Sequence, residues 1–564
     1  MAMAASWPRG LGGLVACGAR RGLPAARRGL RHGAGGGRHV AAAASASPAA
    51  VPHPGATPAL RIHNTRGRKK EAFTAGEGNK VRVYVCGVTV YDLAHIGHAR
   101  CYVSFDVVVK HLRRLGHEVT YVRNYTDVDD KILKRAEERG EDPVELAARF
   151  VDEFRADMER LGCCPPDVEP KVTEHVEEIV RMVHQIVDNG AGYAAEDGSG
   201  DVYFSVASQG ERYGELSGRR EEDNEAGGGG RVDLGGDEAG RKRAPQDFAL
   251  WKGSKSEGEL GWDSPWGRGR PGWHIECSAM SCKHLGEVID IHGGGSDLIF
   301  PHHENELAQS RAATLGRADV RYWMHNGFVK VDNEKMSKSL GNFFTVRDVL
   351  ERYDPEALRW FLLCTQYRAP INHSDANLNE ASSRLYYIYQ TLADADDLVA
   401  SLSAEELAEQ REVPVAKPVL KAIADMKKEA DEGMADDLNT PRVVASCTEP
   451  LKQINDILGT KAGRKMPGRA AAVEQLAAEL RAGPFDYLGV GTSSPSLILG
   501  RLRAKALVRM GLTEEDILSK LEQREAARAA KDWAASDALR DELLAQGIAV
   551  MDGAGGQPSS WRPA

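Results

Sequence analysis

The sequence predicts an α/β fold built on a parallel sheet. A short β-branched run, Val81–Val85, has the composition of a buried strand. Apolar residues recur at helical spacing through His95–Gly116, and a glycine is a natural residue to follow a helix. Val119–Tyr125 is a second strand-like run. A strand, a helix and a strand in this order form a βαβ unit, whose strands are parallel.

The rest of the chain divides into a mixed region and a long helical region. With 564 residues, about three or four domains are expected. Residues 130–190 carry helical patterning, Arg219–Arg243 is a Gly-rich charged loop, and patterned sequence resumes at Phe248. The pattern is mostly helical over Ala381–Val508. One further helix is expected over Glu514–Gln546, followed by a Gly-containing tail.

The N-terminal stretch differs from the rest in charge. Met1–Lys70 holds ten Arg, two Lys and no acidic residue. Such a stretch, rich in Arg, Ala, Gly and Ser, is typical of an organelle transit peptide, and it lacks the compact apolar core of a secretory signal. We therefore predict a disordered, cleaved transit peptide over residues 1–58, for chloroplast, mitochondrion or both rather than the cytosol. A tail without any address is the alternative.

The remainder of the chain is acidic. Because the whole chain has a net charge of −9 and the first 70 residues carry +12, the rest carries −21. This balance argues against nucleic-acid binding by bulk charge, although local basic patches can still hold an RNA. Without a run of about 18 apolar residues, no membrane-spanning helix is expected. Nine cysteines at irregular spacing indicate reduced thiols.

Two short polar motifs are candidates for phosphate chemistry. His95-Ile96-Gly97-His98 begins the predicted helix, where free N–H groups and the helix dipole attract phosphate. The histidines can donate to a developing phosphate charge, and the glycine allows close approach of a nucleotide. Lys335-Met336-Ser337-Lys338-Ser339 lies in a polar loop, where its lysines can hold a leaving pyrophosphate. Each motif alone is better explained by solvated polar residues.

Together, in this order and about 240 residues apart, the motifs resemble the HIGH and KMSKS motifs of class I aminoacyl-tRNA synthetases. The resemblance implies a Rossmann-type nucleotide-binding fold that forms an aminoacyl-adenylate by attack on the ATP α-phosphate. Catalysis is then mostly positioning and charge stabilisation. The implied catalytic residues are His95, His98, Lys335 and Lys338, and the implied ATP contacts are His95, Gly97, His98 and Lys338.

Four separated residues form a candidate metal site. Cys86 ends the first strand, Cys277 lies in the segment Trp273–Met280, and His302 and Glu306 share one helix face. Two thiolates, an imidazole and a carboxylate suit zinc. Spacing alone does not decide, because His303 with Glu306 would do nearly as well. Buried free cysteines beside a polar helix start are the other explanation.

Four blocks of the sequence resemble cysteinyl-tRNA synthetases: Tyr84–His98, Gly269–Met280, His292–Glu306 and Lys335–Val349. The resemblance implies that Cys86, Cys277, His302 and Glu306 bind one Zn²⁺ ion. Zinc prefers a thiolate to a hydroxyl, so the metal would select cysteine over serine, which a plain pocket separates poorly. The resemblance also implies a cysteine pocket of Gly87, Thr126, Trp273 and His292, with Asp297 on the ribose of ATP or on the substrate. A core Trp and a capping Asp are the alternatives for Trp273 and Asp297.

The same resemblance implies the domain order. A Rossmann catalytic domain (59–173 and 269–316) holds a connective insertion (174–268); a KMSKS and stem-contact region (317–380), a helical bundle (381–508) and a small anticodon-binding domain (509–564) follow. In the last domain, Arg528, Trp533, Asp537 and Asp552 match positions that read the anticodon. Arg and Asp can hydrogen-bond to unstacked bases, and Trp can stack on them. An amphipathic helix with Trp533 in its own core is the alternative.

The implied reaction is activation of L-cysteine with ATP and Mg²⁺, followed by transfer to the 3′ end of tRNA(Cys). The expected partners are tRNA(Cys), L-cysteine and ATP, without a membrane, and a monomer is expected. One alternative is a cysteine-activating amide ligase on the same fold, which would lack the anticodon module. Another is an inactive tRNA-binding homologue, against which both motifs and all four candidate ligands argue.

Overall fold

The computed structural model describes residues 58–219, 241–256, 258–332, 334–336, 342–491, 493–553 and 558–563. Three predicted features lie outside the described residues: the transit peptide up to residue 57, most of the Gly-rich loop, and Lys338. For Lys335 only the backbone is described.

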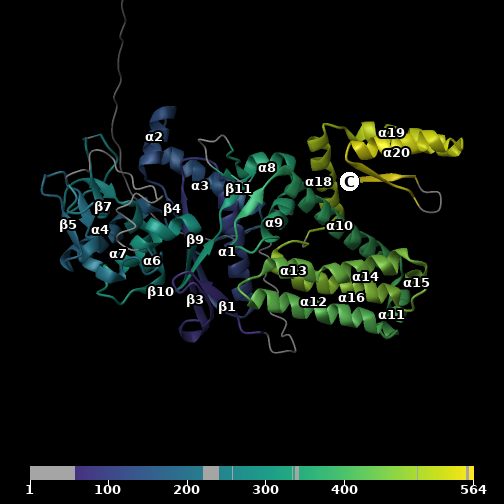
Figure 1. Ribbon diagram of the computed structural model, residues 1–564, viewed down its shortest axis with the longest axis horizontal. Coiled ribbons are helices and arrows are strands. Elements are labelled where there is room, and N and C mark those ends of the chain that lie inside the picture. Colours follow the sequence, from purple (N-terminus) through teal and green to yellow (C-terminus); the bar gives the residue numbers. More distant parts are fainter. Residues whose placement is uncertain are drawn as a thin grey trace, which may run out of the picture. The chain divides into compact units, whose positions relative to one another are not determined.

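A four-stranded parallel sheet is the centre of the α/β part of the chain (Figure 1). Its strands are β3 (Lys80–Thr89), β4 (Glu118–Thr126), β9 (Val288–Gly295) and β10 (Asp319–Asn326), in the spatial order β10-β9-β3-β4. Helix α1 (Ile96–Arg114) connects β3 to β4, which pair in parallel. The predicted βαβ unit and the α/β fold class are therefore confirmed.

The local sequence explains these elements. Val81, Val83 and Val85 of β3 are completely buried, as expected for β-branched residues in a covered parallel strand. His95 caps the start of α1, because its ring accepts a hydrogen bond from the backbone N–H of His98. Basic residues in the last turn complement the helix dipole at the other end.

The order of the strands reverses between β3 and β9. From β3 the chain crosses to β4 on one side, and it later returns to β9 on the other side. Such a switch point opens a crevice at the carboxyl ends of the strands. Cys86 and His292 lie in the carboxyl-terminal halves of β3 and β9, so the fold brings two sequence-predicted site residues to this crevice.

Shorter elements surround the sheet. The N-terminal hairpin is β1 (Arg61–Asn64) with β2 (Lys69–Ala72), and helices α2 (Asp130–Arg139) and α3 (Pro143–Arg160) follow β4. Next come α4 (Val176–Asp188) and an antiparallel sheet of β5 (Gly192–Ala194), β6 (Val202–Phe204), β7 (Phe248–Gly253) and β8 (Gly269–Pro271). Helices α6 (Trp273–Leu285) and α7 (Glu304–Ala313) flank β9 in sequence, and β11 (Val329–Val331), β12 (Glu334–Lys335) and β13 (Ile371–His373) form a small sheet.

Helices make up most of the described chain between residues 346 and 510, and over Ala381–Val508 this agrees with the predicted helical region. The helices are α8 (Val346–Arg352), α9 (Pro355–Leu363), α10 (Asp375–Ala400), α11 (Ala404–Glu412), α12 (Lys417–Ala435), α13 (Thr440–Ser446), α14 (Thr448–Gly459), α15 (Lys461–Arg464), α16 (Arg469–Leu480), α17 (Asp486–Leu488) and α18 (Pro495–Met510). None of the helices in the described part of the chain combines the length and apolar character that a membrane crossing needs. The cysteines of the described residues are all free thiols.

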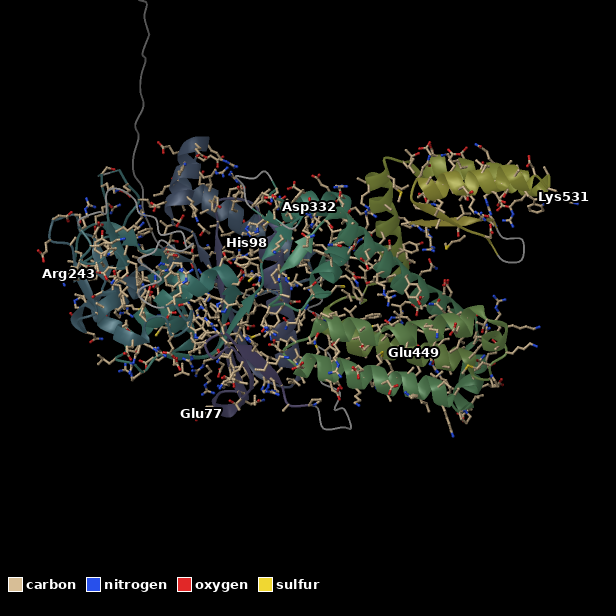
Figure 2. The ribbon with its side chains drawn as sticks, viewed as in Figure 1. Glu77, His98, Arg243, Asp332, Glu449 and Lys531 are labelled. Carbon is tan, nitrogen blue, oxygen red and sulfur yellow. The ribbon has the colours of Figure 1, made fainter. Side chains whose placement is uncertain are left out.

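The single helix predicted over Glu514–Gln546 is wrong. The structure has two helices there, α19 (Glu514–Ala529) and α20 (Trp533–Ala545). Lys531, labelled in Figure 2, lies between them with a φ of 61°, a left-handed conformation that a right-handed helix cannot contain. The Gly-containing tail holds two strands: β14 (Ile548–Met551) pairs with β15 (Ser560–Pro563), and Trp561 is buried against α19 and α20.

Candidate active site and metal centre

Cys86 and Glu306 are the centre of a buried cluster of metal-binding side chains. The Cys86 Sγ lies 3.4 Å from Glu306 Oε1 and 3.7 Å from Cys277 Sγ. His302 Nε2 lies 3.0 Å from the same carboxylate oxygen. These four residues, predicted as a metal set, have donor atoms within 4.8 Å of one another. Strand β3, helix α6, the helical turn Ile299–His303 and the start of α7 therefore converge on one point.

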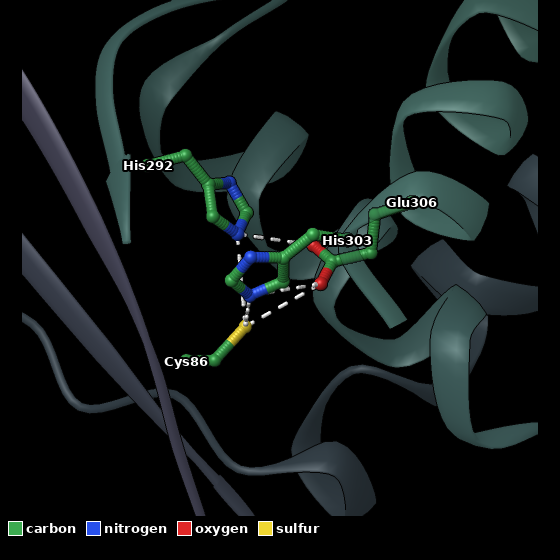
Figure 3. A group of neighbouring side chains, drawn as sticks. All are labelled: Cys86, His292, His303 and Glu306. Atoms are coloured by element: carbon green, nitrogen blue, oxygen red, sulfur yellow. Dashed lines mark hydrogen bonds and ion pairs between the residues drawn. The ribbon is translucent and has the colours of Figure 1, made fainter. Parts of the chain in front are cut away.

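A second set of donors overlaps the first (Figure 3). Cys86 and Glu306 also meet His292 and His303, with the His303 Nε2 at 3.3 Å and the His292 Nε2 at 3.6 Å from Cys86 Sγ. The two sets share a thiol and a carboxylate, so six donors surround one site. The geometry alone leaves both His302 and His303 as candidate ligands.

The chemistry of the cluster fits a divalent cation. Cys86, Cys277, His302 and Glu306 are each at most 4% exposed. Burial raises the pKa of the Cys86 thiol and of the Glu306 carboxyl above their usual values, while a hydrogen bond from Cys86 lowers the pKa of Cys277 to about 7. Glu306 Oε2 makes no hydrogen bond among the described residues, and its nearest polar contact is an ion pair with His292 Nε2 at 3.3 Å. A divalent cation would replace the protons of these buried groups and balance the charge of the resulting thiolates and carboxylate.

Neighbouring rings orient the histidines. His302 Nδ1 lies 2.9 Å from His274 Nδ1, and the ring of His302 stacks on Trp273 with centroids 4.3 Å apart. His303 Nδ1 lies 2.7 Å from the Nε2 of His325. Contacts of this kind fix the orientation of each ring and leave its other nitrogen free to bind a metal ion.

The predicted cysteine-pocket residues lie around this cluster. Trp273, the first residue of α6, is 40% exposed, which makes a purely core role for it wrong. Thr126 ends β4 and donates a hydrogen bond to Glu276 at 2.9 Å. The backbone N–H of Gly87 donates to the Asn124 side chain, and a Cβ on Gly87 would lie 1.6 Å from Asn124 O, so only glycine fits between the strands.

The HIGH-like motif forms the start of α1. The rings of His95 and His98 stack with centroids 3.6 Å apart (His98 is labelled in Figure 2). A Cβ on Gly97 would lie 2.8 Å from the His95 ring and 3.7 Å from Met336 Cε. The motif therefore presents a packed pair of imidazoles at a helix N-terminus, next to the beginning of the second motif.

Backbone contacts tie the two motifs together. The N–H of Ile96 donates to Phe344 O at 3.2 Å, and that of Val346 donates to Ala94 O at 2.8 Å. Met336 precedes the undescribed stretch 337–341, and Phe344 follows it, so both ends of the KMSKS-like loop lie beside the HIGH-like motif. Asp297 is exposed in the turn that follows β9.

The four C-terminal residues fall into two pairs. Arg528 donates to Asp552 at 2.6 Å, as does the buried Arg524 at 2.7 Å. Trp533 and Asp537 lie one turn apart on α20, and Trp533 is 61% exposed. The alternative of Trp533 in a helical core is therefore wrong.

Sequence reasoning missed several residues of the site. His274 and His325 support the two candidate histidine ligands, and Asn124 lies 3.8 Å from Cys277 Sγ. His274 lies three residues before Cys277 on α6, a helical spacing that could have linked it to the site. His325 lies in β10 and Asn124 in β4, so only the tertiary fold identifies these two residues.

Family models match both ends of this architecture. The model described as "tRNA synthetases class I (C) catalytic domain" matches residues 72–383, and the model "Cysteinyl-tRNA ligase anticodon binding domain" matches residues 514–562. A solved methionyl-tRNA synthetase from Mycobacterium tuberculosis, bound by methionyl-adenylate, shares the fold at 14% identity and a TM-score of 0.55, over 77% of this chain and 95% of that one. The chain is a class I aminoacyl-tRNA synthetase.

Relatives that align with most of the chain identify its family within this class. A cysteine–tRNA ligase from Arabidopsis thaliana, named as chloroplastic/mitochondrial, is 51% identical over 505 residues, covering 90% of this chain and 86% of its own. A cysteine–tRNA ligase from Anaeromyxobacter sp. (strain K) is 49% identical, covering 89% and 99%. The chain belongs to the cysteine–tRNA ligase family and is a ligase enzyme.

Proposed function

We propose that the chain activates L-cysteine with ATP and Mg²⁺, releases pyrophosphate, and transfers cysteine to the 3′ end of tRNA(Cys), with zinc selecting the substrate thiol. One observation carries the proposal: two buried thiols and a carboxylate meet within 4 Å beside the switch point of the sheet. The test is cysteine-dependent exchange of pyrophosphate into ATP by the purified chain. Absence of exchange with zinc present would favour an inactive homologue.

Cys86, Cys277, His302 and Glu306 would hold the zinc ion. When bound, zinc prefers a sulfur ligand and stabilises its thiolate form, which a serine hydroxyl cannot match. The second thiolate favours this set over the set with His292 and His303, because zinc prefers soft thiolate ligands. Trp273 and His292 would then wall the pocket, with Gly87 and Thr126 next to the amino-acid group.

The two histidines separate the candidate ligand sets experimentally. His302→Ala is expected to lower zinc from about one per chain to a small fraction, since a ligand is lost. His303→Ala is expected to retain most of the zinc and lose roughly 10-fold in affinity, the usual cost of a supporting residue. Metal analysis after dialysis measures both. The reverse order of loss would assign the site to His303.

The adenylation step is proposed to use both motifs. His95 and His98 would donate to the ATP phosphates at the start of α1, and Gly97 would let the nucleotide approach the backbone. Lys335 and Lys338 would stabilise the charge that develops on pyrophosphate. Asp297 would hold the ribose. The contacts between Ile96 and Phe344 and between Ala94 and Val346 support this pairing, because they hold the segment that follows the second motif beside the first.

The C-terminal domain is proposed to read the anticodon through Arg528, Trp533, Asp537 and Asp552. The exposed ring of Trp533 can stack on a base, and Asp537 lies one turn away. Trp533→Ala and Asp537→Ala are each expected to lower kcat/KM for aminoacylation by about 10–100-fold, or 1–3 kcal/mol of lost stacking or hydrogen bonding. Pyrophosphate exchange should stay within about twofold. An equal loss in both reactions would instead indicate a folding defect.

Location, oligomeric state and domain limits are also proposals. The acid-free stretch Met1–Lys70 and the printed names of the plant relatives support import into chloroplast, mitochondrion or both. A reporter fused to residues 1–70 tests this directly, and cytosolic fluorescence would contradict it. We keep the monomer and the domain limits given above as predictions. The match at 514–562 favours a synthetase over an amide-forming ligase.

A further inference from the structure

Asp437 is a buried carboxylate in the corner between α12 and α13, away from both catalytic motifs in sequence. It is completely buried, and its φ is 61°, followed by a φ of 50° at Leu438. Two successive non-glycine residues in the left-handed region cost free energy, and they persist only where surrounding contacts hold them. The backbone conformation at Asp437 therefore costs stability, and the contacts that hold it need an explanation.

The carboxylate accepts hydrogen bonds from three consecutive residues of another segment. Its Oδ1 accepts from the Tyr367 hydroxyl at 2.9 Å, and its Oδ2 accepts from Arg368 Nε at 2.7 Å and from Gln366 Nε2 at 3.1 Å. The backbone N–H of His63 completes the set at 2.8 Å. One side chain of the helical region thus orders the stretch 366–368 between α9 and β13.

The HIGH-like helix is anchored on that stretch. Arg100 lies in α1, two residues after His98, and is completely buried. Its guanidinium donates to the carbonyl oxygens of Thr365 at 3.1 Å and Gln366 at 2.9 Å, and also to that of Leu362. A shift of residues 365–366 would therefore move the first turns of α1.

The strand that leads to the KMSKS-like loop is anchored there as well. The N–H of Gly327 donates to Tyr367 O at 2.8 Å, just before β11. Strand β11 pairs with β12, which contains Lys335. The helix that begins with the first motif and the segment that leads to the second therefore both bond to the same short stretch, and Asp437 holds that stretch.

We propose that Asp437 is a positioning residue for adenylation, which sets the distance between the HIGH-like helix and the strand before Lys335. The inference rests on the adenylation roles proposed above for those motifs. It means that the helical region influences the chemical step through residues 365–368. A displacement of about 1 Å in such a site can cost roughly 100-fold in rate.

The test is Asp437→Asn in the full chain, measured by pyrophosphate exchange. Asparagine tolerates the left-handed conformation and keeps one acceptor oxygen, but its NH₂ group cannot accept from Arg368 or Gln366. The kcat is expected to fall roughly 10–100-fold, with KM for cysteine and zinc content within about twofold. Tyr367→Phe removes a single donor and should lower kcat about 3- to 10-fold, the equivalent of one hydrogen bond, in a chain that still folds.

A matched control lies beside the antiparallel sheet of β5, β6, β7 and β8. Asp201 is also buried and accepts from an arginine, a tyrosine and a backbone N–H: Arg241 at 3.1 Å, Tyr203 at 3.0 Å and Gly253 at 2.8 Å. Asp201→Asn should keep wild-type kcat. The inference is overturned if Asp437→Asn and Tyr367→Phe keep wild-type kcat, or if Asp201→Asn loses as much. His98→Ala separates the two proposals, because full exchange by that variant would instead overturn the adenylation roles themselves.

Discussion

Replacing Cys277 by serine is expected to remove bound metal and cysteine activation together. The Cys277 thiol is 2% exposed and lies 3.7 Å from Cys86, so its loss takes one of two sulfur donors from the site. A bound metal contributes several kcal/mol to a reaction that depends on it. Cysteine-dependent exchange should therefore fall by about 100-fold or more, and metal analysis should show little zinc.

Cys447→Ser is the matched control for this change. Cys447 is a completely buried thiol next to α13, and its Sγ donates only to the Val443 carbonyl, at 3.4 Å, among the contacts of the described residues. The Cys447→Ser chain should keep its zinc and should exchange pyrophosphate at the wild-type rate. A Cys277→Ser chain with normal zinc and normal exchange would rule out the proposed ligand set.

Asp106→Asn is expected to have the second large effect, a loss of folding stability. Asp106 and Arg359 form an ion pair in which both side chains are 1% exposed, and Arg359 also donates to Leu488 O and Leu161 O. Burial alone would favour the neutral carboxyl, but Arg359 and Lys110 hold the pKa of Asp106 below its usual value. The substitution leaves a buried guanidinium without its counter-charge, which costs about 3–5 kcal/mol.

Urea denaturation followed by circular dichroism measures this loss. Arg113→Ala, on the same helix, breaks an exposed pair with Asp167 and should cost less than about 1 kcal/mol. Equal midpoints for Asp106→Asn and Arg113→Ala would mean that the buried pair does not tie α1 to α9.

Local features of the sequence predicted the centre of the fold. The β-branched run of β3, the helical spacing of α1 and the glycine after it lie within 40 residues, so periodicity alone was enough to find the βαβ unit. The HIGH-like motif was likewise readable, because a helix N-terminus is a local structure. The pattern of these elements is readable locally, although tertiary packing supplies most of their stability.

Long-range contacts could not be predicted from spacing. Cys86 and Cys277 are 191 residues apart, and only the pairing of β3 with β9 and the packing of α6 bring their thiols together. The break at Lys531 was missed because the helical pattern continues on both sides of one left-handed residue. Asp437 gave no signal at all, since its partners lie about 70 and 374 residues away.

The proposed function depends most on the selection of the substrate thiol by the metal. The direct test is pyrophosphate exchange with L-cysteine and L-serine side by side, in the zinc-loaded chain and after zinc removal by a chelator. We expect the zinc-loaded chain to prefer cysteine in kcat/KM by well over the roughly 100-fold that a plain pocket achieves between such isosteres. Zinc removal should abolish that preference. An unchanged preference for cysteine in the zinc-free chain would contradict the account.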